Sequence, residues 1–435
     1  AKNNNSNNDN SNKSASPAVL IINEKLKGSS SATGNPSSGF NGLFGGGSTA
    51  GWKVVHGDDA LRPSRALEEA QQQRKSAMLA CQQSRTMYQD NNFPAEAKSL
   101  YGQDRTAATK SSGTDSGTPQ CGCNRSAKKS NVQKEGPNKG RPYWHCETRT
   151  CRFFAWADSE HRRSAKMWWQ RFPEFVVVHD CGFRADDLRQ GGVGDCWFLS
   201  ALAVVAERPD LILRLFAGET TRNAVGCYQL RLFLDGEWQA ITIDDQLPVT
   251  DQQRRPDGSG LAYSRADGQQ LWTPLLEKAY AKAHGSYKAI SGGEIAEALL
   301  DLTGCPTESI DFGEDGFDTE ELWQRLVHFK QKEFPMGCAT AGNPELKEVG
   351  LCGNHAYSIL DVREIFDERF LGRDLGYGGT REDGWVRLLR IRNPHGVGEW
   401  SGEWSDHSSE WSGRLAAQLG RSGIDDGTFW MDFTH

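Results

Sequence analysis

The stretch Gln190-Gly-Gly-Val-Gly-Asp-Cys-Trp-Phe-Leu-Ser-Ala-Leu202 places one cysteine, Cys196, between a glycine-rich turn and an apolar segment with helical spacing. A thiol in the first turn of a helix lies at the positive end of the helix dipole, which favours the thiolate. Thiolates are the nucleophiles of cysteine proteases, so this stretch predicts covalent catalysis. The side-chain amide of Gln190, on the same loop, is placed to donate a hydrogen bond to an oxyanion on the attacked carbonyl. The alternative is that Cys196 is a small buried residue, the usual state of a free cysteine.

A cysteine nucleophile needs a base, and the base needs a residue that orients it. Among the ten histidines, His355 begins an apolar, β-branched run that predicts a buried strand. A second predicted strand, 384–392, ends at Asn393, so two neighbouring strands would present His355 and Asn393 side by side. The alternatives are a core histidine and a turn residue before proline. His395 is a rival base, although its position in a turn favours a rigid catalytic role less.

Further motifs follow in order along the chain. They are Ile-Asp-Asp-Gln-Leu-Pro at 243–248, Leu-Leu-Glu-Lys-Ala-Tyr-Ala-Lys at 275–282, Gly-x-His-Ala-Tyr-Ser at 353–358, Arg-Asn-Pro at 392–394, Glu-Trp-x-Gly-x-Trp at 399–404 and Asp-Gly-x-Phe-Trp-Met at 426–431. With the Cys196 stretch, these motifs make residues 165–435 resemble the calpains, within the papain-like group.

The resemblance to calpains implies an α+β, two-lobed papain-like protease core, with a first lobe at about 165–303 and a second at about 304–435. It implies an intracellular cysteine endopeptidase that hydrolyses peptide bonds in protein substrates. In this assignment Cys196 is the nucleophile, His355 the base, Asn393 the orienting residue and Gln190 the oxyanion donor. The rival interpretation is a catalytically silent scaffold that uses the same fold for binding.

Calpain cores are calcium-gated, so the resemblance also implies Ca²⁺ as a regulatory cofactor. Calcium takes several oxygen ligands. The matching positions are Gly182 and Asp187 for a first site, and Glu399, Asp406 and Asp426 for a second.

Three positions depart from the calpain pattern. Gln270 replaces an acid of the first calcium site, Thr428 replaces a glutamate of the second, and His395 stands where calpains carry tryptophan. Fewer charges predict weaker calcium affinity. The alternative for the remaining acids is that they solvate loops or pair with arginines. His395 either admits water to the orienting hydrogen bond or introduces its own titration near neutral pH.

A separate signal lies at 118–160, where two cysteine pairs suit a structural, tetrahedral Zn²⁺ site in a segment too small to fold by burial alone. The predicted ligands are Cys121, Cys123, Cys146 and Cys151, with His145 a less favoured substitute for one of them. The segment resembles GRF-type zinc fingers. Its basic and aromatic residues are typical of a groove for single-stranded nucleic acid, or of a docking site for a protein partner. The alternative is that the aromatic residues form the finger's own core.

Composition sets the remaining limits on this chain of 435 residues with net charge −7. No apolar run predicts a membrane span. Eleven cysteines without a disulfide pattern suit a reducing compartment, so we expect a cytoplasmic protein, with the nucleus as an alternative. Residues 1–117 are largely of low complexity, which predicts disorder apart from one polar helix near 62–89.

Overall fold

The computed structural model describes residues 19–23, 65–102, 127–133, 139, 142–148, 154–156, 167–217, 219–250, 260–311, 318–374, 380–381 and 384–434. The predicted disorder of residues 1–117 therefore falls mostly outside the described residues. None of the helices in these ranges has the length and apolar character needed to cross a membrane.

The first lobe is mainly helical and is built around α4 (Cys196–Ala206), in which every residue after Cys196 is buried. A helix that is apolar on all sides needs neighbours on all sides, and α4 packs against α5, α7 and strand β13. The other helices here are α3 (Ala97–Tyr101), α5 (Pro209–Leu215), α6 (Trp272–Ala283) and α7 (Ile295–Thr303). This apolar packing holds the start of α4 in a fixed place.

Short antiparallel strand pairs complete the first lobe. The longest pair is the hairpin of β7 (Cys227–Leu234) with β8 (Glu237–Asp244). The other pairs are β5 (Met167–Gln170) with β9 (Leu247–Thr250), and β6 (Leu188–Arg189) with β10 (Arg265–Ala266).

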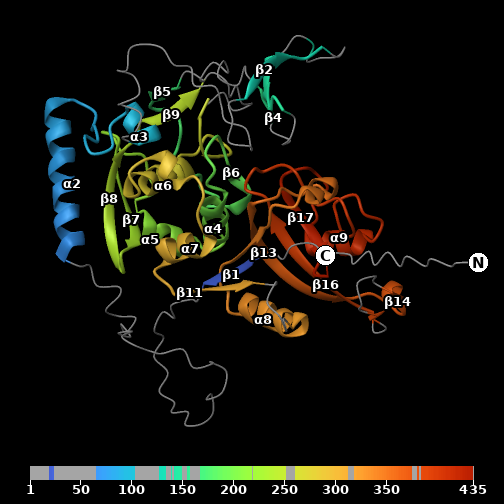
Figure 1. The fold of residues 1–435 in the computed structure, drawn as a ribbon. Helices are drawn as coiled ribbons and strands as arrows, with labels where there is room; N and C mark the ends of the chain where they lie inside the picture. Colours follow the sequence, from blue (N-terminus) through green and yellow to red (C-terminus); the bar gives the residue numbers. More distant parts are fainter. Residues whose placement is uncertain are drawn as a thin grey trace, which may run out of the picture.

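The helix predicted near 62–89 is α2 (Arg65–Ser84), and it packs on the hairpin at the outer side of this lobe (Figure 1). The Arg74 guanidinium is almost fully buried, forms an ion pair with Glu219 and donates a hydrogen bond to the Cys227 carbonyl at 3.0 Å. A buried arginine thus helps to hold this mostly polar helix to the lobe, together with the Gln229 amide, which donates to the Ala70 carbonyl at 3.0 Å.

The second lobe is a six-stranded sheet in the order β11-β1-β12-β13-β16-β17. All its neighbouring strands are antiparallel. The strands are β11 (Thr307–Asp311), β1 (Val19–Asn23), β12 (Met336–Thr340), β13 (His355–Phe366), β16 (Trp385–Arg392) and β17 (Thr428–Asp432). Helices α8 (Thr319–Gln331) and α9 (Gly413–Leu419), with the short strands β14 (Arg373–Asp374) and β15 (Thr380–Arg381), complete the lobe.

One strand of this sheet comes from the segment for which the sequence predicted no regular structure. Val19–Asn23 pairs with β11 on one side and β12 on the other. A short apolar, β-branched run can enter a sheet when two strands leave a gap between them, although its flanks are of low complexity.

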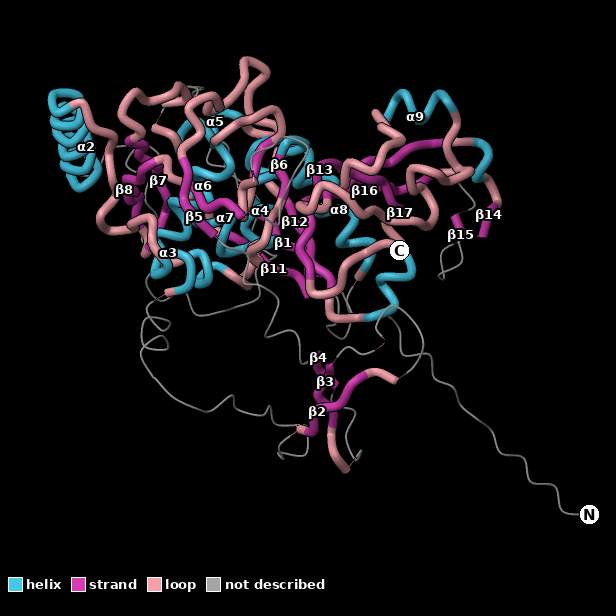
Figure 2. Tube along the Cα trace, turned by 90° about the horizontal axis from the view of Figure 1, so that it is seen from above, coloured by secondary structure: helices cyan, strands magenta, loops and turns pink. Residues whose placement is uncertain are grey.

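The finger region contains a three-stranded antiparallel sheet, β2 (Lys128–Asn131), β3 (Pro142–His145) and β4 (Phe154–Trp156). The two lobes of the core meet where α4 lies beside β13, as both views show (Figures 1 and 2). The Ser358 hydroxyl on β13 donates to the Ser200 carbonyl of α4 at 2.8 Å, which fixes the helix against the strand.

Candidate active site

His355 and Asn393 lie side by side, as the sequence predicted. His355 is the first residue of β13, and Asn393 directly follows the paired strand β16. The His355 Nε2 and the Asn393 Oδ1 are 2.9 Å apart, and both side chains are buried.

The orientation of the Asn393 amide identifies the free nitrogen of the imidazole. The Asn393 Nδ2 donates to the carbonyls of Val397 at 3.0 Å and Gly398 at 2.9 Å, so its oxygen must face His355. An oxygen acceptor requires Nε2 of the ring to carry the proton. In the neutral ring Nδ1 then keeps its lone pair, which is the form a general base needs.

The environment of His355 keeps its ring neutral. Burial lowers the pKa of His355 to about 4, the hydrogen bond that His355 donates to Asn393 opposes this shift, and the neighbouring His395 adds to it. At neutral pH the imidazole is therefore able to accept a proton.

Cys196 is the first residue of α4, and its sulfur lies against the start of β13. The backbone N–H of Ala356, the residue after His355, hydrogen bonds with the sulfur of Cys196 and lowers the pKa of the thiol. The structure therefore brings Cys196 from the first lobe to the strand that begins with His355.

The expected thiolate is not favoured in this arrangement. Burial raises the pKa of the Cys196 thiol, and it outweighs the backbone N–H groups that lower the pKa. The backbone N–H groups at the start of α4 lower the pKa, as the helix dipole predicts, but the loss of water around the sulfur has the larger effect. The pair is a neutral thiol and a neutral imidazole.

Gln190 lies on the loop before α4, but its amide bonds within that loop. Its Nε2 donates to the Val193 carbonyl at 2.9 Å, while its buried Oε1 finds no donor among the described residues. The Gln190 backbone N–H donates to the Pro394 carbonyl at 2.7 Å and ties this loop to the turn after Asn393. A side chain on the neighbouring Gly191 would meet the Tyr263 backbone at 2.1 Å, which explains the glycine there.

His395 is exposed and stacks on His355, with ring centroids 4.5 Å apart and planes 16° from parallel. Its backbone N–H donates to the Asn393 Oδ1 at 3.1 Å. Although the residue is exposed, the loss of water around its ring lowers the pKa of His395. No hydrogen bond within the described part of the chain links its ring to Asn393, so the geometry favours His355 as the base.

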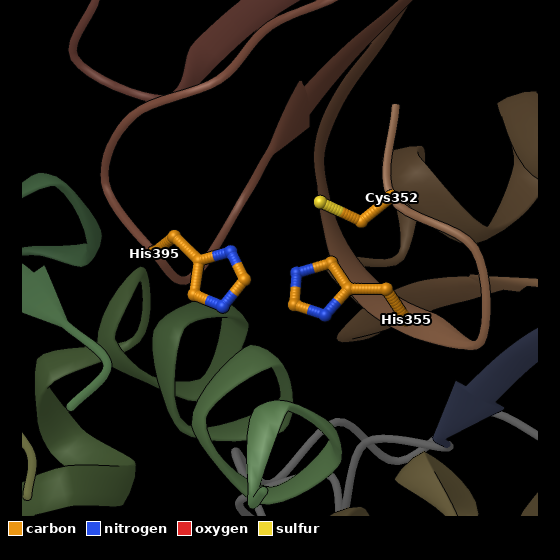
Figure 3. A group of neighbouring side chains, drawn as sticks. All are labelled: Cys352, His355 and His395. Carbon is orange, nitrogen blue, oxygen red and sulfur yellow. The ribbon is translucent and has the colours of Figure 1, made fainter. Parts of the chain in front are cut away.

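Sequence reasoning missed Cys352, which lies three residues before His355. Ligand atoms of Cys352, His355 and His395 lie within 4.8 Å of one another, and Figure 3 shows the three side chains facing a common space. No spacing rule predicts this group, because the three residues meet only when β13 and β16 pair.

The two loops compared with calcium sites differ in character. At the first, the Gln270 Nε2 donates to the Asp187 Oδ2 at 3.1 Å and to the Asp267 carbonyl at 2.8 Å. An amide N–H therefore stands against the Asp187 carboxylate, where a cation would need an oxygen. The first loop does not fit calcium as it stands.

The second loop fits a cation better. One oxygen of the buried Asp406, Oδ2, has no hydrogen-bond donor among the described residues. Burial, with the nearby carboxylates of Asp406, Asp425 and Asp426, raises the pKa of Glu399 to about 7. Thr428 accepts a hydrogen bond from the buried Arg392 at 2.9 Å. Glu399, Asp406 and Asp426 are the residues that would hold a calcium ion here.

In the finger region, Cys146 is buried, with its Sγ 3.3 Å from the Thr148 hydroxyl. The other predicted zinc ligands, Cys121, Cys123 and Cys151, lie outside the described residues. Both ring nitrogens of His145 are engaged, by Ser130 at 2.9 Å and by the Cys146 carbonyl at 3.0 Å, which argues against His145 as a ligand. The Lys129 ammonium lies 5.4 Å above the Trp144 ring, on a face that a base would need for stacking.

Comparison with known proteins identifies two regions. Residues 149–435 match the calpain family of cysteine proteases, and residues 119–160 match the GRF zinc finger. The chain is 37% identical over 257 residues to the calpain-type cysteine protease ADL1 of Oryza sativa subsp. japonica. The aligned segment covers 57% of this chain and 11% of that protein. It is 38% identical over 286 residues to the calpain-type cysteine protease DEK1 of Arabidopsis thaliana, covering 61% of this chain and 12% of the relative.

An animal relative matches the same part of the chain. Calpain-5 of Mus musculus is 33% identical over 276 residues, which is 58% of this chain and 41% of calpain-5. The chain thus spans less than half the length of these three relatives. Since the family match covers most of the chain, together with the fold around Cys196 and His355, this protein belongs to the calpain family of cysteine proteases.

Proposed function

We propose that this chain is a cysteine endopeptidase that hydrolyses peptide bonds in proteins through Cys196, His355 and Asn393. The observation that carries the proposal is the hydrogen bond between His355 Nε2 and Asn393 Oδ1, on a strand whose next backbone N–H contacts the Cys196 thiol. Two lobes thus supply the nucleophile and an oriented base to one place, the arrangement that covalent acyl transfer requires.

The proposed reaction starts from the neutral pair. The Cys196 thiol gives its proton to His355 Nδ1 as its sulfur attacks the peptide carbonyl. The imidazolium then protonates the leaving amine, and the C–N bond breaks to leave an acyl-enzyme. A water molecule, deprotonated by His355, releases the acid and restores the thiol. The Gln190 amide stabilises the oxyanion once it leaves the Val193 carbonyl.

We further propose that calcium acts at the second loop and not at the first. The unpartnered Asp406 oxygen supports a cation there, and the Gln270 amide argues against one beside Asp187. Bound calcium would supply charge neutralisation among the carboxylates, whereas Asp406 and Glu399 position it. For the finger, the family match and the buried Cys146 support a structural zinc ion.

Active-site labelling tests the protease proposal. The full chain would be treated with an epoxide or iodoacetamide reagent, with and without calcium, and the modified cysteine identified by mass spectrometry, alongside hydrolysis of casein. We expect selective modification of Cys196 and casein cleavage that Cys196→Ala abolishes. Cys81→Ser, on the remote helix α2, serves as the control and should keep both the selective modification of Cys196 and the cleavage of casein. If Cys196 is not selectively modified and casein stays intact both with and without calcium, the scaffold interpretation holds instead.

A further inference from the structure

Three potential metal ligands meet at the edge of the candidate active site, and they come from separate parts of the second lobe. Cys352 lies in the loop before β13, His355 begins β13, and His395 lies in the turn after β16. One sulfur and two ring nitrogens lie within 4.8 Å of one another (Figure 3). This group is distinct from the acidic loops, which offer only oxygen.

The spacing of these atoms suits a tetrahedral thiophilic ion. Bonds of about 2.0–2.1 Å to nitrogen and about 2.3 Å to sulfur place neighbouring ligand atoms about 3.4–3.6 Å apart. Small side-chain rotations therefore close the group around an ion. One thiolate and two imidazoles are ligands that zinc prefers and calcium avoids.

The site is also accessible. His355 is buried, but Cys352 is half-buried and His395 is exposed, so an ion can reach the group from solvent. Three protein ligands leave a fourth position for water, as in open zinc sites. The two outer ligands are particular to this chain in different ways: the resemblance to calpains places tryptophan at His395, and Cys352 belongs to none of the calpain motifs.

We propose that Cys352, His355 and His395 form an inhibitory binding site for a divalent cation of the zinc class. The inhibitory part rests on the proposed protease function. An ion on His355 Nδ1 would occupy the lone pair that accepts the thiol proton. An ion on Nε2 would displace the proton shared with Asn393 and leave the remaining ring proton on Nδ1. In both cases His355 stops acting as a base, and chelation restores it.

Activity measurements on the full chain test the inhibition. Casein hydrolysis would be followed across a zinc titration at fixed calcium, with each variant normalised to its own rate without zinc. For Cys352→Ser and His395→Trp we expect the half-inhibitory zinc concentration to rise by on the order of 10–100-fold. The His395→Trp variant keeps a ring against His355 but offers no ligand. Cys81→Ser is the matched thiol control, and zinc should inhibit it at the same concentration as the wild type.

Binding is measured separately, with cobalt(II) as the spectroscopic probe. We expect a thiolate-to-cobalt charge-transfer band, and one equivalent of cobalt lost in Cys352→Ser. Cys146→Ser removes the finger's contribution and should leave that equivalent in place. Equal cobalt stoichiometry in wild type and Cys352→Ser, or an unchanged zinc midpoint in both ligand variants, overturns the proposal. If no casein is cleaved at all, the protease function fails while the cobalt titration still decides the site.

Discussion

The two lobes contribute unequal halves to the candidate site. In the second lobe, His355 and Asn393 are hydrogen bonded to each other, and two backbone carbonyls fix the Asn393 amide. In the first lobe, the loop that carries Cys196 has a buried Gln190 oxygen without a donor among the described residues. The proposed base is thus held by hydrogen bonds, whereas the loop before the proposed nucleophile keeps one buried acceptor without a donor among the described residues.

This difference indicates where the protein must change for catalysis. A raised pKa at Cys196 and an oxyanion donor bonded to Val193 are both properties of the first-lobe loop. The Asp195 carboxyl is fully buried, and burial together with Glu277 raises its pKa. We therefore expect the Gln190 side chain, and not the His355–Asn393 pair, to change its hydrogen bonds during catalysis.

Among the residues that support the proposed nucleophile, the orienting residue should have the largest effect when it is removed. Asn393→Ala removes the acceptor that fixes the His355 tautomer, and we expect kcat to fall by about 10⁴-fold. Burial of the amide means that the variant also loses stability, so its thermal midpoint must be measured at the same time. His395→Ala is the comparison, because it removes a ring beside His355 without removing the acceptor. A folded Asn393→Ala variant with nearly full activity would contradict the assigned role.

Gln190→Ala tests the first-lobe half. If the amide leaves Val193 to donate to the oxyanion, kcat should fall by about 10²–10³-fold, with little change in KM. Gln246, whose amide lies outside the site, provides the matched control through Gln246→Ala. An unchanged kcat would mean that the Gln190 side chain stays bonded in its loop during turnover.

The pH dependence of kcat/KM tests the second-lobe residue His355 separately from the first-lobe loop. The active form needs neutral His355, so activity is lost as pH falls through the pKa of this imidazole. Since that pKa is lowered to about 4, the acid limb of kcat/KM should lie below the ordinary histidine value of about 6.5. The test is to measure kcat/KM in small steps from about pH 3.5 to about pH 8. An acid limb near pH 6.5 would show that His355 is less buried in the working enzyme.

Much of the second-lobe half was predictable from the sequence, and less of the first. Strand periodicity and the motifs placed His355 and Asn393 at the ends of two strands, and β13 and β16 are indeed paired. The raised pKa of Cys196 was not predictable, because it depends on how deeply the folded chain buries the thiol. Cys352 was missed for a similar reason: a cysteine in a loop acquires meaning only from the rings that tertiary pairing brings to it. The strand Val19–Asn23 likewise depends on partners about 290 to 320 residues away in the chain.

The smallest expected effect contrasts the two acidic loops. The measurement is made at pH 8, above the raised pKa of Glu399 of about 7, where this carboxylate is charged. Calcium should then raise the thermal midpoint of unfolding by a few degrees, which corresponds to about 1–3 kcal/mol of binding free energy. Asp406→Asn should remove this increase because it alters the buried carboxylate that lacks a donor. Asp187→Asn should keep the increase, since the Gln270 amide already occupies that carboxylate. The opposite pattern, with the increase lost in Asp187→Asn alone, would mean that Gln270 turns its oxygen to the ion and that the first loop is the calcium site.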